Sequence, residues 1–249
     1  MNRQAQAAVL FLLGASLLHA ATTDLYLRYV KQGLRPLVLL SGAVLIAAAV
    51  ATVWYERKRA RGRGRGRKHD DEPGDGPGHA HHEPRVSWLL VLPLFALILV
   101  APPALGSYSA TRAGTALQEP LAYPALPSAD PLRLGVVDYA GRAVYDHGRT
   151  LQGRRVQLTG FLALDRDGTP YLVRMALNCC AADAQPVKVA LAGRIPPVLQ
   201  PDTWLRITGT YSPRRAKDPV NGGPIPFIEV TEAKPVAAPK DPYDESWNG

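Results

Sequence analysis

Two cysteines stand side by side in the stretch LNCCAADAQP, residues 177–186, and they are the only two in the 249-residue chain. Neighbouring Cα atoms across a trans peptide lie about 3.8 Å apart, whereas a disulfide usually needs about 4.4–6.8 Å, so a bridge between Cys179 and Cys180 would be strained. On a regular strand the two side chains would point to opposite faces. A shared ligand therefore requires the chain to turn at this point.

Three interpretations of this pair are open from the sequence. In a structural interpretation, both thiols are small buried residues at a strand end, and Asp183 accepts hydrogen bonds from backbone amides of the turn. In a redox interpretation, the pair forms a strained disulfide in an oxidising compartment. In a metal interpretation, Cys179, Cys180 and Asp183 bind a divalent metal such as zinc, and His147 or a partner protein completes four ligands.

A second group of candidate ligands lies in the stretch HDDEPGDGPGHAHHEP. Imidazole and carboxylate groups suit zinc and similar ions, and this stretch combines acidic residues with His79, His81 and His82. The alternative is a solvated loop without a metal, whose neighbouring arginines contact anionic headgroups and fix the topology.

Catalytic motifs are absent from the sequence. The chain contains no nucleophile elbow, no glycine loop of the phosphate-binding type and no HExxH pair. A thiol oxidoreductase usually has a CxxC spacing, which adjacent cysteines do not provide. We therefore expect a binding or interaction protein and no enzyme.

Apolar residues concentrate in three runs before residue 106, at Ala5–Ala21, Pro36–Tyr55 and Val86–Leu105. About 20 apolar residues span a bilayer core, so the sequence predicts three transmembrane helices. The first run is the shortest and also resembles a secretory signal, although the residues near Ala20 form a poor cleavage site.

Eight basic residues lie between Arg57 and Lys68 with no acidic residue among them. By the positive-inside rule this loop is cytoplasmic, which places everything after about Gly106 outside the cytoplasm. Residues 86–249 carry 16 basic and 14 acidic residues, so the net charge of +8 comes mainly from the membrane part. This distribution excludes nucleic acid as an expected partner and leaves the lipid bilayer.

The composition divides the chain into five segments. Residues 1–55 would hold two transmembrane helices, and residues 56–85 a disordered Arg/Gly/His-rich cytoplasmic loop. The third transmembrane helix would span 86–105, a Pro/Ala-rich tether 106–132, and a β domain 133–249.

Five stretches of the last segment have strand character, and a short amphipathic helix near Leu134–Val144 precedes them. Two of these stretches alternate apolar and polar residues and run into a glycine, Gly160 and Gly209, as strands of a small barrel do where they bend. The sequence predicts an OB-like barrel, with an open sandwich fragment as the alternative. The five stretches are Val156–Ala163, Tyr171–Ala176, Val187–Leu191, Trp204–Tyr211 and Pro226–Thr231.

Several stretches together resemble a bacterial membrane protein family of the YcgQ type, described as permease subunits of otherwise unknown function. They are RMALNCCAADAQPVKV, GRRVQLTGF, DTWLRITGTY, PKDPY and, more loosely, LRYVKQGLRPLVLLSG. The resemblance implies a multi-pass protein of the bacterial plasma membrane with a soluble C-terminal domain, and a companion multi-helix permease as partner. It implies no substrate and no catalytic residue.

The sequence thus leads to two function hypotheses of different kinds. The first is an accessory subunit of a membrane permease, whose extracytoplasmic β domain binds partner or cargo. The second is an extracytoplasmic metal-binding protein that uses the Cys-Cys pair, and a thiol redox protein is a weaker third.

Overall fold

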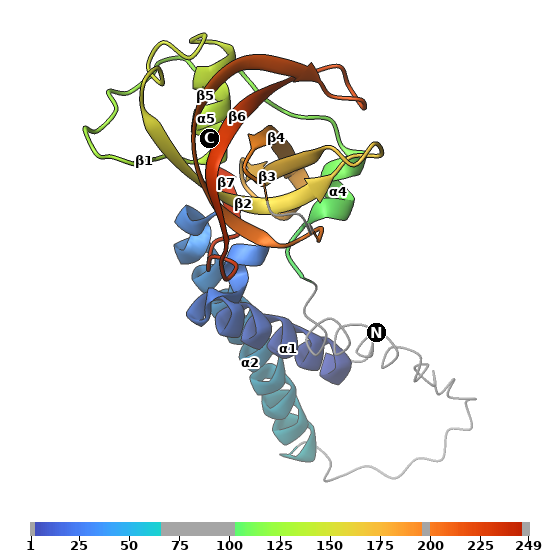
Figure 1. Ribbon diagram of the computed structural model, residues 1–249. Coiled ribbons are helices and arrows are strands. Elements are labelled where there is room, and N and C mark those ends of the chain that lie inside the picture. Colours follow the sequence, from blue (N-terminus) through green and yellow to red (C-terminus); the bar gives the residue numbers. More distant parts are fainter. Residues whose placement is uncertain (1–2, 66–102, 196–199, 246–249) are drawn as a thin grey trace. The chain divides into compact units, whose positions relative to one another are not determined.

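A computed structural model describes residues 3–65, 103–195 and 200–245 (Figure 1). Its contacts divide the chain into two units. The helical unit contains the described residues up to Thr23 and those from Gly33 to Arg65. The β unit contains Asp24–Gln32 together with the residues from Pro103 onward.

The helical unit consists of α1 (Arg3–Thr22) and α2 (Arg35–Arg65). Both helices are long and apolar enough to cross a membrane. The structure therefore gives two such helices in the described residues, where the sequence predicted three. Most of the third predicted span, Val86–Leu105, lies outside the described residues, and its last three residues are irregular backbone of the β unit.

Two glycines bring α1 and α2 close together. A Cβ atom on Gly14 would lie 2.8 Å from the carbonyl oxygen of Gly42, and one on Gly42 would lie 2.9 Å from Leu18. Only residues without a side chain allow backbones to approach this closely, and small residues favour helix pairing in membranes for the same reason. Alanines are buried on the same two helices, at Ala5, Ala7, Ala21 and Ala49.

The first part of the expected disordered loop is helical. The sequence predicted that order would end at Tyr55, but α2 continues through the basic residues to Arg65. Arginine, lysine and alanine are strong helix formers, so a helix that is already nucleated in its apolar part can propagate through them. Residues 66–85, including His79, His81 and His82, lie outside the described residues.

The β unit is built on seven strands. Strand β2 pairs with both β5 and β3, and the ladder β2-β5-β6-β4-β3 returns to β2, so five strands close into a barrel (Figure 1). This closure confirms the barrel and excludes the open sandwich. The strands are β1 (Leu132–Arg133), β2 (Arg155–Leu164), β3 (Pro170–Leu177), β4 (Gln185–Gly193), β5 (Trp204–Lys217), β6 (Pro224–Pro235) and β7 (Tyr243–Glu245).

Helix α5 (Val136–Val144) covers one end of the barrel. Its apolar residues Val136, Tyr139 and Ala143 are fully buried in one cluster with inward-facing residues of the barrel strands, such as Val156 and Ile207. The alternation along β2 and β5 that predicted strands is the alternation that fills this core.

The expected tether is a packed strap. Residues 103–131 lie along the β unit, where α4 (Ser107–Arg112) buries Ala110 against strands β2, β3 and β4. Farther along, the Ala116 amide donates to the Pro186 carbonyl at 2.9 Å, and the buried guanidinium of Arg142 donates to the Pro124 carbonyl at 2.8 Å. The Pro/Ala composition gives no sign of this packing, because the strap is held mainly through its backbone.

Candidate metal centre

The turn that carries the cysteines joins β3 to β4. It contains a short 3-10 helix, η4 (Ala181–Asp183), whose N-cap is Cys180 in an extended conformation, with φ −153° and ψ 168°. The Cys180 side chain accepts from the Asp183 amide, while the Asp183 carboxylate accepts from the Cys180 amide, so the two residues form a capping box. This local bonding folds the chain back between the two strands.

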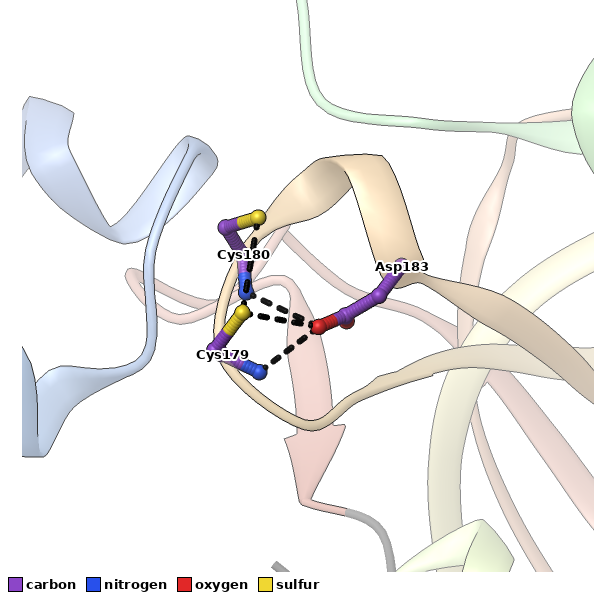
Figure 2. A group of neighbouring side chains, drawn as sticks. All are labelled: Cys179, Cys180 and Asp183. Carbon is purple, nitrogen blue, oxygen red and sulfur yellow. Dashed lines mark hydrogen bonds between the residues drawn. The ribbon is translucent and has the colours of Figure 1, made fainter.

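Asp183 organises the same turn from its centre (Figure 2). Its Oδ1 accepts from the Asn178 amide at 3.0 Å. Its Oδ2 accepts from the Cys179 amide at 2.9 Å, as Figure 2 shows. Oδ2 also accepts from the Cys179 thiol, with the sulfur 3.0 Å away. These bonds include the amide contacts expected under the structural interpretation. Burial of the thiols, which that interpretation also required, is wrong, because Cys179 is exposed and Cys180 is partly exposed.

The turn places the two sulfurs on one side of the chain. Cys179 Sγ and Cys180 Sγ lie 3.6 Å apart, and both are free thiols. The ligand atoms of Cys179, Cys180 and Asp183 all lie within 4.8 Å of one another (Figure 2). The turn therefore removes the objection that neighbours on a strand point to opposite faces.

These separations suit a single ion. In a tetrahedral site with Zn–S bonds of about 2.3 Å, two ligating sulfurs lie about 3.8 Å apart, and a sulfur and a carboxylate oxygen about 3.5 Å. The sulfurs are close to this spacing at 3.6 Å, while Cys179 Sγ and Asp183 Oδ2 are somewhat closer at 3.0 Å.

The contact between the Cys179 thiol and the Asp183 carboxylate shifts the pKa values of the two groups in opposite directions. The hydrogen bond to Asp183, followed by that to Cys180, raises the pKa of Cys179 to about 12. Burial works to raise the pKa of Asp183, but the hydrogen bonds from the Cys179 thiol and from the amides outweigh it and hold this pKa below its ordinary value. At neutral pH the pair is thus a carboxylate and a protonated thiol, a poor nucleophile.

A segment distant in sequence braces the turn. The Lys31 amide donates to the Cys179 carbonyl at 3.0 Å, and the Ala181 amide donates to the Tyr29 carbonyl at 2.7 Å. Val30 and Cys180 form an antiparallel bridge between these two bonds. This segment could not be predicted from the sequence, because only its backbone atoms make these contacts and no residue type signals them.

Of the other predicted ligands, His147 does not join this group, and His79, His81 and His82 lie outside the described residues. His147 is exposed, and its Nδ1 lies 3.1 Å from an Arg215 nitrogen, while its carbonyl accepts from Tyr211. It adopts a positive φ of 51° in the turn that follows α5. In the described residues the candidate ligands are therefore Cys179, Cys180 and Asp183, which leave a fourth position open.

Comparison with known proteins gives one match. No curated protein and no solved structure matches the chain. The matched part is residues 138–244, which contain the cysteine turn and all five barrel strands. These residues match the family model of the DUF1980 C-terminal domain, a family label that names no activity.

Proposed function

We propose that this protein is a membrane-anchored metal-binding protein whose extracytoplasmic β unit takes up one thiophilic ion at Cys179, Cys180 and Asp183. The observation that carries the proposal is the convergence of two thiols and a carboxylate within 4.8 Å on one braced turn. The ion would displace the thiol protons, since the thiolate is the form that ligates metals.

The chemistry of the three ligands narrows the class of ion. Thiolates favour zinc and copper(I), whereas magnesium and calcium prefer oxygen ligands. Closed structural zinc sites supply four protein ligands. Here the fourth position is open to a solvent molecule or to a ligand from a partner, which suits a site that exchanges its ion. A transferring or sensing role therefore fits these ligands better than a purely structural one.

The thiol redox alternative receives less support from the same geometry. A reactive thiol needs a lowered pKa and an electropositive environment, but Asp183 raises the pKa of Cys179 to about 12. The exposed thiol is thus held protonated by the group that would share the ion.

The contacts that brace the turn suggest how metal binding could affect the connection between α1 and α2. The segment Tyr29–Lys31, which pairs with the turn, lies in sequence between α1 and α2. Tyr243 and Lys240 hold the same connection, through the carbonyl of Arg28 at 3.0 Å and the carboxylate of Asp24 at 2.9 Å. An ion that stiffens residues 178–183 would change the stability of this connection.

A second function, the accessory subunit of a membrane permease, rests on the surface of the helical unit. Leu37, Leu40 and Val44 are each more than half exposed on α2, although the residue types are those of a protein core. In a bilayer these side chains would face lipid or other helices. The YcgQ-type resemblance supports a multi-helix permease as the companion that packs there, with the protein in the bacterial plasma membrane and its β unit outside.

Metal analysis of the full-length protein in a neutral detergent tests the metal proposal. Titration with Cd²⁺ should produce an ultraviolet thiolate-to-metal absorption band that saturates at one ion per chain. The variant with Cys179→Ser and Cys180→Ser should lose the band. Asp167→Asn should keep it, because Asp167 orders another turn through the Thr169 amide.

Two results would overturn the proposal. One is the absence of a saturable band in the unmodified protein under reducing conditions. The other is equal metal uptake by the unmodified protein and the variant without thiols, which would place the ion elsewhere.

Purification of the native protein from its own membranes in a mild detergent tests the permease proposal. A multi-helix membrane protein should co-purify in a fixed ratio and be lost when Leu37, Leu40 and Val44 are replaced by alanine. Recovery of the protein alone, or of unrelated membrane proteins in variable amounts, would contradict the proposal.

A further inference from the structure

The β unit contains a cleft that is separate in sequence from the cysteine turn and rich in positive charge. It has a volume of about 410 Å³. Its polar lining comes from five of the strands, with Arg133 on β1, Gln157 and Thr159 on β2, Arg174 on β3, Arg206 on β5 and Asp244 on β7.

Only one of the three guanidinium groups in this cleft has an acidic partner in the described part of the chain. Arg174 Nε lies 3.0 Å from Asp244 Oδ1, and the same side chain donates to the Tyr243 carbonyl at 2.7 Å. Arg133 and Arg206 are exposed and form no ion pair with a described residue. The cleft therefore carries a net charge of +2 from three arginines and one aspartate.

The strand register places the uncommitted arginines beside neutral hydrogen-bonding side chains. Arg133 pairs with Gln157 across β1 and β2, and Arg206 pairs with Thr159 across β5 and β2. Gln157 and Thr159 are two positions apart on β2 and so lie on the same face. One ligand could thus meet two guanidinium groups, an amide and a hydroxyl.

The wall of the cleft already binds one anionic group of the chain itself. Asp244 Oδ2 accepts from the amides of Val136 at 2.9 Å and Val137 at 3.3 Å, at the N-terminus of α5. Its other oxygen bonds Arg174. The positive end of the helix and Arg174 together favour a carboxylate there. The neutralised pair of Arg174 and Asp244 leaves Arg133 and Arg206 for an external anion.

We propose that this cleft is a phosphate-binding site, with Arg133 and Arg206 as the charged contacts and Gln157 and Thr159 as neutral donors. Guanidinium groups match oxyanions through paired hydrogen bonds. A phosphate group has more acceptor oxygens than a carboxylate and can use two guanidinium groups together with an amide and a hydroxyl. Its charge matches the +2 of the cleft. The phosphate is either free in solution or part of an anionic lipid headgroup.

Calorimetric titration of the full-length protein in a neutral detergent with inorganic phosphate tests the free source. Arg133→Gln and Arg206→Gln should each lower the affinity about tenfold, and the double variant should abolish saturable binding. Arg166→Gln removes the same charge at the exposed β2–β3 turn and should leave the affinity unchanged.

Mixed micelles that contain phosphatidylglycerol test the lipid source, with phosphatidylcholine micelles as the reference. Preferential retention of phosphatidylglycerol, lost in the double variant and kept in Arg166→Gln, would assign the site to a lipid headgroup. Binding of inorganic phosphate with the same variant pattern would assign it to a soluble phosphate. The proposal is overturned if neither probe binds saturably, or if the Arg133 and Arg206 variants bind as the Arg166 variant does.

Discussion

The thiol of Cys179 donates its proton to the carboxylate of Asp183, with 3.0 Å between Sγ and Oδ2. The acid stabilises the protonated thiol and raises the pKa of Cys179 to about 12. The same contact therefore protects an exposed cysteine from reaction and positions a carboxylate beside it.

Removal of the negative charge should make Cys179 reactive. In a Cys180→Ser background, Asp183→Asn should lower the pKa of Cys179 toward the ordinary thiol value of about 8.5, so alkylation at pH 8 should become at least about tenfold faster. The rate of iodoacetamide modification against pH measures this shift. Asp167→Asn serves as the control, and an unchanged pH profile in Asp183→Asn would contradict the role of the carboxylate.

Metal affinity should rise with pH for the same reason. An ion that binds the Cys179 thiolate must displace a proton that is held up to about pH 12. The logarithm of the apparent Cd²⁺ affinity should thus increase by at least about one per pH unit between pH 6 and 8. Proton release into a weak buffer during the titration provides an independent measurement. A pH-independent affinity would mean that the ion does not bind this thiolate.

A buried ion pair joins β4 to the loop that connects β5 and β6. Lys188 Nζ lies 2.7 Å from Asp218 Oδ2, and both side chains are at most 5% exposed. Asp218 also accepts from the Thr115 amide of the strap at 2.9 Å. Asp218→Ala should lower the free energy of unfolding by about 3–5 kcal/mol, because it leaves the ammonium group buried without its partner.

The pH dependence of this pair follows from the low pKa of its acid. Burial works to raise the pKa of Asp218, but hydrogen bonds from Lys188 and from backbone amides outweigh it and lower the pKa. The contribution to stability is therefore present above the unfolded pKa of about 3.9 and is lost as the pH falls through the folded value. Thermal unfolding of the full-length protein, followed by circular dichroism from pH 6 downward, should show this loss. The exposed pair of Lys234 and Glu232 is the control, and its removal should change stability by less than about 1 kcal/mol.

The contact between Gly14 and Gly42 should hold the helical unit together. Gly42→Leu should separate α1 from α2, because even a Cβ atom would lie 3.0 Å from the Gly14 carbonyl oxygen. Gly33→Leu is the matched control, since a Cβ atom there meets nothing within 4 Å. Spin labels attached at Phe11 and Val44 in a cysteine-free background report the separation. Equal distances in both variants would show that the glycines do not set the helix spacing.

Much of the barrel was predictable, because the side chains that fill its interior recur along each strand with a period of two. Val156 and Leu158 are fully buried on β2, as their alternation indicated. The strands β5 and β6 extend beyond the predicted ends, since their backbone ladder includes residues 215–217 of β5 and residues 232–235 of β6. β1 and β7 form because they pair with β2 and β3. At two and three residues they are too short to show a periodicity in the sequence.

The candidate site was predictable in its residue types but not in its geometry. Adjacent cysteines with an aspartate three positions later indicated thiolate chemistry, and the outward position of Arg206 follows from the alternation of β5. The two sulfurs converge because of η4 and of the backbone contacts with Tyr29–Lys31. Arg133 and Arg206 come to the same cleft because β1 pairs with β2. These are long-range contacts, which local patterns do not encode.

The side of the membrane on which the cysteine turn lies decides which chemistry is open to it. The eight basic residues between Arg57 and Lys68 should stay in the cytoplasm, because their translocation against the membrane potential is costly. In a cysteine-free background, Gly64→Cys should react with a membrane-impermeant maleimide only after the membrane is opened. Arg166→Cys, at an exposed turn of the β unit, should react in intact cells. This position is a better reporter than Cys179, whose raised pKa slows its reaction. The reverse pattern would place Cys179 and Cys180 in the reducing cytoplasm, where a disulfide is disfavoured and a metal thiolate is the remaining chemistry of the pair.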